Sequence, residues 1–164
     1  MTKRKIEIYT DGSCKGNPGP GGWAAFFLEP NASKPFHIEK GNESHTTNNR
    51  MEMVAMIEAL HFLREKKLQS AEINLYSDSN LLIQTLNLGW KKKANLDLWE
   101  ELNELDEELD VNYIWVKGHA KNKWNNECDK IAQHQADLAA KAGSKSPSTT
   151  IRHKKSSSKQ QELF

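Results

Sequence analysis

Four acidic residues stand where their carboxylates could hold a metal ion against a polyanion. Asp11 follows an alternating apolar run that predicts a half-buried strand, and Asp78 follows a second run of this kind. Glu52 and Asp129 each fall in the predicted first turn of a helix. Grouped carboxylates repel one another unless cations are present, and ligands that are all oxygen suit Mg²⁺ or Mn²⁺ rather than zinc. Two such ions about 4 Å apart can activate a water and stabilise the leaving oxygen in phosphodiester hydrolysis.

Each acid, taken alone, also has an ordinary structural explanation. Glu52 and Asp129 could stabilise a helix N-terminus, and Asp11 or Asp78 could begin a turn. The joint placement of all four favours a site. If the two strands are neighbours, their ends and the starts of the covering helices lie at one edge of the sheet, which is where ligands bind in α/β folds.

The apolar periodicity predicts the elements that position these acids. Their order, β-β-β-α-β-α-α-β-α, indicates an α/β fold with a mixed sheet, an antiparallel start and right-handed parallel crossovers. In the first helix we expect a capping box formed by Asn49 and Glu52. The predicted strands cover residues 6–9, 23–28, 36–40, 71–76 and 111–116, and the predicted helices cover 50–66, 80–86, 95 or 97 to 109, and 126–142.

The composition predicts one domain followed by a tail. The 164 residues suffice for a sizeable core, and from residue 144 the chain turns to Ser, Lys, Thr, Gln and Pro without apolar periodicity. We therefore expect a folded domain over residues 1–143 and a disordered basic tail over residues 144–164. The tail carries a formal charge of +4 and the domain carries −3, so the domain is not coated with positive charge.

Several other classes of protein leave no sign in the sequence. The two cysteines, Cys14 and Cys128, form no CxxC pair, and the six histidines lack HExxH spacing, so neither a disulfide framework nor a zinc site is indicated. No apolar stretch predicts a secretion signal or a membrane span, and the expected location is the cytoplasm. The glycine-rich residues 12–22 lack the Gly-Lys-Ser/Thr of a P-loop and instead predict close backbone approach to a ligand.

Five motifs in order make residues 3–142 resemble a bacterial ribonuclease H of the type I family. The motifs are YTDGSCKGNPGPGGW at residues 9–23, TTNNRME at 46–52, YSDS at 76–79, NLDLW at 95–99, and WVKGHA at 115–120 leading to Cys128 and Asp129. The resemblance implies a ribonuclease H-like fold, with a five-stranded mixed sheet in the order 3-2-1-4-5 flanked by helices. It also implies an endonuclease that hydrolyses the RNA strand of RNA–DNA hybrids by two-metal-ion catalysis, leaving 5′-phosphate and 3′-hydroxyl ends.

The resemblance also implies the roles of the acids. Asp11, Glu52, Asp78 and Asp129 would be ligands of two Mg²⁺ ions that bind with the substrate, Asp11 would bridge both ions, and Mn²⁺ could substitute. His119, on a loop beside the site, would assist proton transfer or the departure of product and metal. Without its Val-Lys-Gly-His context, His119 would be interpreted as an exposed loop residue.

Six further positions match substrate contacts of the family. The positions that read the ribose 2′-hydroxyls of RNA are Cys14, Asn17, Asn48 and Asn49. The positions that grip a phosphate of the DNA strand are Thr47 and Asn95. Residues of these types are also common in turns and helix caps, and some can serve both purposes.

The sequence departs from the family pattern near its substrate contacts. His45 stands two residues before Thr47, where the family usually has Arg, so we expect a weaker and pH-dependent grip on the DNA strand. The basic handle of the best-known members is reduced to residues 86–94. There Trp90 and the lysines at 91–93 could stack on and neutralise a DNA strand, or could form a solvated loop.

The chain ends in QQELF, which resembles the Gln-x-x-Leu-Phe peptide that docks on the bacterial sliding clamp. Gln160, Leu163 and Phe164 would be the contacting residues, carried on a flexible linker that tethers the enzyme. The alternative is a disordered end without a partner.

Together these patterns predict a monomeric, Mg²⁺-dependent hybrid endonuclease that acts in DNA replication and repair without membrane association. Another nuclease of the same superfold, such as a resolvase or integrase, is disfavoured by the ribose-reading asparagines. A noncatalytic hybrid-binding module is disfavoured by the four intact acids and His119.

Overall fold

The computed structural model describes residues 3–118 and 122–143. Within these residues the chain forms five strands and four helices in the predicted order. The elements are β1 (Lys5–Cys14), β2 (Gly19–Leu28), β3 (His37–Thr46), α1 (Asn48–Glu65), β4 (Glu72–Ser77), α2 (Asn80–Leu88), α3 (Leu96–Glu108), β5 (Val111–Trp115) and α4 (Lys123–Ala142).

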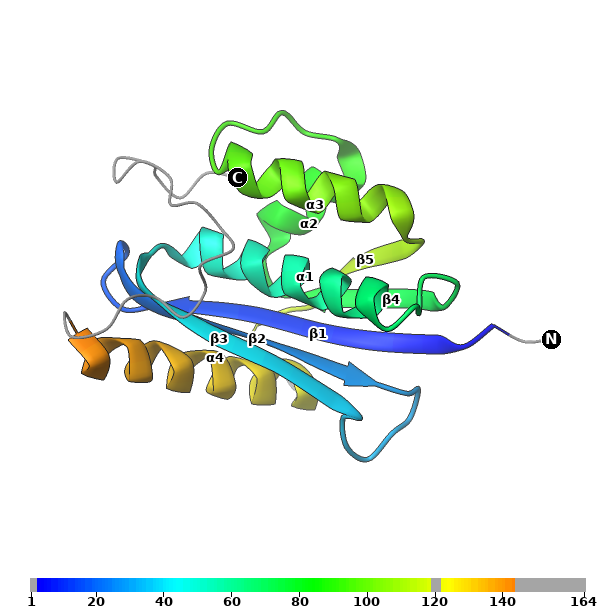
Figure 1. Ribbon diagram of the computed structural model, residues 1–164, viewed down its shortest axis with the longest axis horizontal. Coiled ribbons are helices and arrows are strands. Elements are labelled where there is room, and N and C mark those ends of the chain that lie inside the picture. Colours follow the sequence, from blue (N-terminus) through cyan, green and yellow to red (C-terminus); the bar gives the residue numbers. More distant parts are fainter. Residues whose placement is uncertain (1–2, 119–121, 144–164) are drawn as a thin grey trace.

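The strands form one mixed sheet in the order β3-β2-β1-β4-β5 (Figure 1). This is the order that the family resemblance implied, and it is confirmed. β1, β2 and β3 pair in antiparallel fashion, whereas β4 pairs in parallel with both β1 and β5. β1 therefore lies at the centre of the sheet, between an antiparallel and a parallel neighbour.

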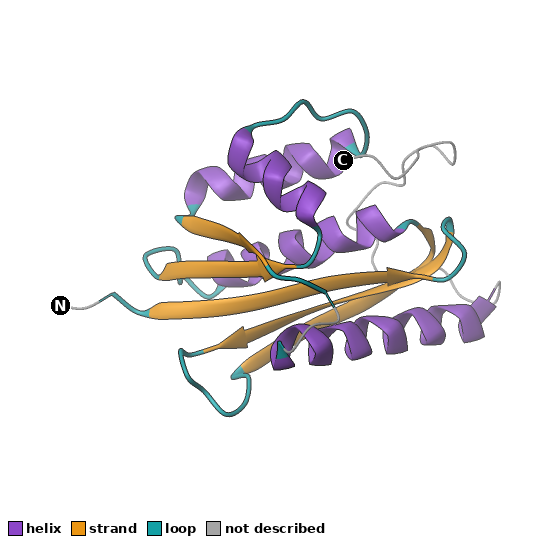
Figure 2. Cartoon of the chain, turned by 180° about the vertical axis from the view of Figure 1, so that it is seen from behind, coloured by secondary structure: helices purple, strands orange, loops and turns teal. Residues whose placement is uncertain are grey.

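Helices cover both faces of the sheet. The helices α1, α2 and α3 lie on one face and α4 lies on the other (Figures 1 and 2). Successive residues of a strand point to opposite faces of the sheet, so two apolar clusters form. Ile8 and Phe27 pack with α1 on one face, whereas Tyr9 and Phe26 pack with α4 on the other. This division explains the unbroken apolar run of β2, which is buried on both sides. None of the helices within residues 3–118 and 122–143 is both long and apolar enough to cross a membrane.

Four element boundaries differ from the predicted ones by three residues or more. β1 continues to Cys14 rather than ending at residue 9, because it goes on pairing with β2 beyond the apolar alternation. β2 begins at Gly19 rather than at residue 23, because the glycines before Trp23 also pair with neighbouring strands. β3 runs on to Thr46, well past the predicted end at residue 40, since backbone pairing with β2 does not require apolar alternation. α4 begins at Lys123 rather than at residue 126, after the N-cap Asn122.

The predicted capping box of the first helix is wrong. Thr47 is the N-cap, and its side chain accepts a hydrogen bond from the backbone N–H of Arg50. Glu52 therefore lies in the second turn of α1, and the earlier start of α4 likewise puts Asp129 in a second turn. Neither first turn contains an acidic residue, which removes the helix-terminus explanation for these two carboxylates.

Candidate active site

The pairing of β1 with β4 brings the two strand-end acids side by side. In this parallel pair Tyr9 lies opposite Tyr76, and Asp11 and Asp78 each follow two residues later. β4 ends at Ser77, whereas β1 continues to its end at residue 14. Side chains from either face of the sheet can therefore approach Asp11 where β4 has ended.

Glu52 reaches the same place from α1. The helix packs so closely on β1 that a Cβ added to Gly12 would lie 2.4 Å from the backbone nitrogen of Glu52. Only glycine permits this approach without moving backbone. The Gly12 N–H also donates to Asp11 Oδ1 at 2.9 Å. Gly12 thus sets both the orientation of Asp11 and its distance from Glu52.

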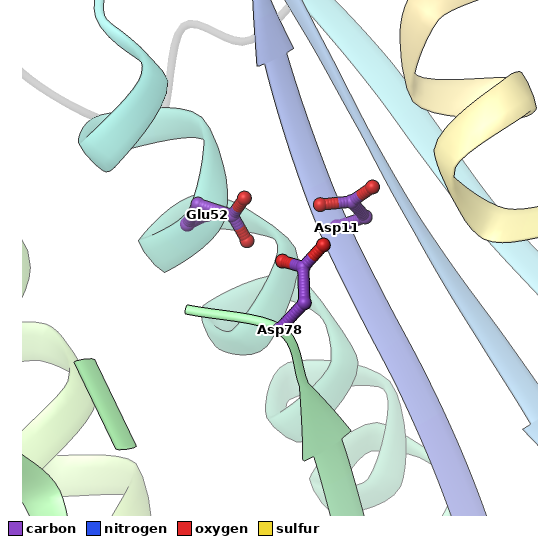
Figure 3. Close-up of side chains that lie close together, drawn as sticks. All are labelled: Asp11, Glu52 and Asp78. Carbon is purple, nitrogen blue, oxygen red and sulfur yellow. The ribbon is translucent and has the colours of Figure 1, made fainter. Parts of the chain in front are cut away.

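Three of the four predicted acids meet at this point. Asp11, Glu52 and Asp78 each offer a carboxylate oxygen, and these oxygens all lie within 4.8 Å of one another (Figure 3). Only 2% of Asp11 and 9% of Glu52 is exposed. In the part of the chain that the structure describes, Asp11 Oδ2 and Glu52 Oε2 are buried without a hydrogen-bond partner. Buried carboxylate oxygens without donors are costly, so this donor set fits a hard divalent cation such as Mg²⁺.

Burial and the neighbouring negative charges raise the pKa values of Asp11 and Glu52. Burial is the largest cause of the raised pKa of Asp11, followed by the negative charges of Glu52 and Asp78. Burial and the charge of Asp78 raise the pKa of Glu52 to about 8. Without metal, Glu52 therefore holds a proton more firmly than a free glutamate does, and a divalent cation would displace it.

Asp129 lies beside this group rather than within it. Gln133 Nε2 donates to Asp129 Oδ2 at 2.7 Å, and Asp129 contributes to the raised pKa of Asp11, although less than burial, Glu52 and Asp78 do. The preceding residue, Cys128, is buried, and its thiol donates to the Tyr9 carbonyl of β1 at 3.4 Å. This contact fixes α4 on the sheet, so that Asp129 is held next to Asp11.

His119 lies outside the described residues, but the segment before it is held against Asp78. Trp115 Nε1 donates to the backbone oxygen of Asp78 at 3.2 Å. A Cβ added to Gly118 would lie 2.8 Å from Asp78 Oδ2. β5 therefore delivers the residues that lead to His119 directly to the acidic group.

The glycine-rich turn is joined to the start of α1. Asn17 Oδ1 accepts a hydrogen bond from Asn48 N at 2.8 Å. The thiol of Cys14 donates to the Thr46 carbonyl at 3.3 Å and is free of any disulfide. The structure thus brings together Cys14, Asn17 and Asn48 of the predicted ribose-reading set, and Asn49 follows in α1.

A buried arginine that sequence reasoning missed lies between the two predicted phosphate-binding residues, with its backbone N–H bonded to Thr47 and its side chain bonded to Asn95. Arg50 donates from its backbone N to Thr47 Oγ1 at 3.2 Å and from Nη1 to Asn95 Oδ1 at 3.3 Å. Its guanidinium also donates to both carboxylate oxygens of Asp97, at 3.0 and 2.8 Å. The available signal was an arginine three residues before Met53 on the apolar face of the helix.

Comparison with known protein families identifies the family to which this fold and site belong. The family model described as RNase H matches residues 3–137. The chain belongs to the ribonuclease H family. The protein named Ribonuclease H of Thermoanaerobacter sp. (strain X514) is 45% identical over 144 residues, which cover 79% of this chain and 88% of that protein. The Ribonuclease H of Chlorobium phaeovibrioides is 41% identical over 145 residues, covering 80% and 94% of the two chains.

Solved structures of ribonucleases H share the fold. The N-terminal RNase H domain of a Mycobacterium tuberculosis protein matches with a TM-score of 0.75 and 29% identity, over 85% of this chain and 99% of that one. LC11-RNase H1, solved in complex with an RNA/DNA hybrid, matches with a TM-score of 0.72 and 25% identity, over 82% of this chain and 99% of that one. The resemblance inferred from the motifs is confirmed.

In this member of the ribonuclease H family the shortened handle is exposed. Trp90 is 46% exposed and Leu88 is 61% exposed. Lys92 Nζ lies 5.2 Å from the centre of the Trp99 ring. His45, near the end of β3, is exposed as well. Exposed aromatic and basic side chains are compatible with stacking on a nucleic acid strand and neutralising it.

Proposed function

We propose that this protein is a metal-dependent endonuclease that hydrolyses the RNA strand of RNA–DNA hybrids and leaves 5′-phosphate and 3′-hydroxyl ends. The observation that carries the proposal is the group of Asp11, Glu52 and Asp78, two of which keep a buried oxygen without a donor among the described residues. Membership of the ribonuclease H family supports the reaction. The complex of LC11-RNase H1 with an RNA/DNA hybrid supports the substrate class.

The four acids would hold the metal. Asp11, Glu52 and Asp78, together with the adjacent Asp129, would bind two Mg²⁺ ions when the substrate is present, and Mn²⁺ would substitute. Bound there, the ions would supply Lewis-acid activation of a water and stabilisation of the leaving oxygen. The chain itself keeps the carboxylates together through the close packing at Gly12, and the burial of Asp11 strengthens its attraction for a cation.

The start of α1 would distinguish RNA from DNA. A ribose 2′-hydroxyl both donates and accepts hydrogen bonds, so amides and backbone groups suit its recognition. Cys14, Asn17, Asn48 and Asn49 offer such groups where the glycine-rich turn meets the helix. His119, outside the described residues, would move a proton or assist the departure of product at the same edge of the sheet.

A comparison of substrates tests this function. Labelled RNA–DNA hybrid, duplex DNA and duplex RNA are each incubated with Mg²⁺ or EDTA and with the wild-type protein, Asp11→Asn or the control Asp110→Asn, which changes an exposed acid between α3 and β5. We expect the wild type and the control to cleave the RNA strand of the hybrid in the presence of Mg²⁺. We expect no cleavage of duplex DNA or duplex RNA, no cleavage in EDTA, and no cleavage by Asp11→Asn. Cleavage of duplex DNA, or cleavage in EDTA, would overturn the proposal.

We further propose that the enzyme acts in the cytoplasm as a monomer during DNA replication, held at the sliding clamp by its tail. Gln160, Leu163 and Phe164 lie outside the described residues, and the proposal rests on the Gln-x-x-Leu-Phe pattern and the basic linker. Calorimetric titration of the clamp with the full chain, and with a chain that lacks the last five residues, tests it. We expect the full chain to bind the clamp and the shortened chain not to bind it. Equal binding by the two chains would contradict the proposal.

A further inference from the structure

Asp78 is held differently from the two acids beside it. Asp11 lies inside β1, where it pairs with β2, and Glu52 lies inside α1, so the hydrogen bonds of a regular element hold the backbone of each. Asp78 lies in the short link between the end of β4 at Ser77 and the start of α2 at Asn80 (Figure 3). Its position therefore depends on contacts from outside its own strand and helix.

The chain at and beyond the end of β5 contacts both the backbone and the side chain of Asp78. Trp115 Nε1 donates to the Asp78 carbonyl at 3.2 Å, and the backbone N–H of Val116 donates to the Ser77 carbonyl at 2.9 Å. A Cβ added to Gly118 would lie 2.8 Å from Asp78 Oδ2, so the same segment also passes against the carboxylate. The indole of Trp115 is the side chain that links this segment to the Asp78 backbone.

Packing in the core does not explain the position of this indole. Trp115 is 47% exposed and belongs to neither apolar cluster of the described residues. Because its hydrogen bond lies at the surface, where water competes for the carbonyl, the bond adds little net stability. It does fix the orientation of the peptide bond that follows Asp78, and with it the direction in which the Asp78 side chain leaves the backbone.

We propose that Trp115 is a positioning residue for Asp78. Its indole N–H keeps the Asp78 carboxylate beside Asp11 and Glu52, so that the group binds a divalent cation. The inference rests on the proposed function. The three carboxylates offer oxygens within 4.8 Å of one another, and like charges at this distance repel. The close packing at Gly12 holds Asp11 and Glu52 together against this repulsion, whereas Asp78 needs a separate contact, which Trp115 supplies.

Trp115→Phe tests this role, because phenylalanine keeps an aromatic ring but lacks the N–H. Calorimetric titration of the full chain with Mg²⁺ alone, without nucleic acid, measures the effect separately from activity. We expect Trp115→Phe to bind Mg²⁺ about fivefold more weakly than the wild type, the size expected when one hydrogen bond no longer restrains a ligand. The matched control in this titration is Trp90→Phe. Trp90 is 46% exposed and follows the end of α2 that lies away from Asp78, so its loss should leave the Mg²⁺ affinity unchanged.

Hybrid cleavage separates positioning from a direct contact with the substrate. If Trp115 acts through Asp78, excess Mg²⁺ should restore kcat of Trp115→Phe to within about twofold of the wild type, with an unchanged KM for the hybrid. Trp115→Ala also lacks the N–H, so its Mg²⁺ affinity should equal that of Trp115→Phe. An indole that stacked on a nucleic acid base would give the opposite pattern, in which Mg²⁺ affinity is unchanged in both variants and KM rises in Trp115→Ala.

The inference is overturned if Trp115→Phe and Trp115→Ala bind Mg²⁺ within about twofold of the wild type, or if excess Mg²⁺ fails to restore kcat of Trp115→Phe. Failure of the proposed function is a different result, in which the wild-type protein binds Mg²⁺ but does not cleave the hybrid. The comparison of Mg²⁺ affinities still tests the role of Trp115 in that case, because it needs no activity.

Discussion

Two groups of buried charge lie close together at the start of α1, and they are built in opposite ways. Glu52 belongs to a group of three carboxylates, of which Asp11 and Glu52 have raised pKa values and each keep one buried oxygen without a donor among the described residues. Arg50, two residues earlier, is paired with Asp97 through both carboxylate oxygens. The first group needs a cation from outside the chain, whereas the second is neutralised within it. The acidic group therefore serves catalysis and lowers stability, whereas the Arg50–Asp97 pair fixes the geometry of the two helices.

The largest expected effect concerns catalysis. Asp11→Asn should lower the rate of hybrid cleavage by about 10³-fold or more, because it removes a charge that the metal and the developing transition state require. Asp97→Asn should leave kcat nearly unchanged, since this pair does not touch the reacting atoms. Single-turnover rates at saturating hybrid measure both variants. An Asp11→Asn enzyme that retains about a tenth of the wild-type rate would contradict the assignment of Asp11.

The two groups should also differ in the sign of their effect on stability. In metal-free buffer Asp11→Asn should raise the free energy of unfolding by about 1 kcal/mol, because it relieves repulsion among buried carboxylates. Asp97→Asn should lower it by about 2 kcal/mol, because it leaves a buried guanidinium without its partner charge. Urea denaturation with matched m-values measures both changes. Equal signs for the two variants would break the comparison.

A smaller effect is expected from pH. The folded state raises the pKa of Glu52 to about 8, above the 4.5 of a free glutamate, so the folded state binds more protons than the unfolded state between these two values. Ionising Glu52 costs more in the folded state than in the unfolded state. The free energy of unfolding is therefore highest below the unfolded pKa and falls as the pH rises through the folded pKa. Melting temperatures in EDTA from pH 5 to about 8.5 should reveal this fall, and it should be weaker in Glu52→Gln. An unchanged pH dependence in Glu52→Gln would contradict it.

The smallest effect is expected at the handle. Replacing Lys91, Lys92 and Lys93 by alanine should weaken hybrid binding several-fold and lower the salt slope by about 1 to 2, because fewer counterions are released. Fluorescence titrations of a hybrid at several salt concentrations measure the slope. If the triple variant keeps the wild-type slope, the handle is a solvated loop.

Sequence reasoning identified most of the fold because the apolar patterns are strong. The alternation of Ile6 and Ile8 and the regular apolar face of α1 predicted their elements, and the family motifs implied the strand order. The start of β2 was missed because strand pairing through glycines leaves no apolar signal. The cap of α1 was misplaced because Thr47 and Asn49 are both good N-caps, and only the tertiary structure selects between them.

The acidic site was also predicted in large part, whereas its neighbouring ion pair was not. Asp11 and Asp78 could be placed together because both follow strands that are expected to be neighbours. Arg50 and Asp97 lie far apart in the sequence on two separate helices, and nothing in either helix alone indicates that they pair. Contacts of this kind depend on how helices pack, which local periodicity does not specify.

Magnesium-dependent melting tests most directly whether the acidic group is a metal site. Thermal unfolding of the wild type, Asp11→Asn and the control Asp110→Asn is followed in EDTA and in excess Mg²⁺. Because a ligand that binds only the folded state stabilises it, Mg²⁺ should raise the melting temperature of the wild type and the control. It should leave Asp11→Asn unchanged, although this variant melts at a higher temperature than the wild type in EDTA. Equal Mg²⁺ shifts in all three proteins would contradict the account.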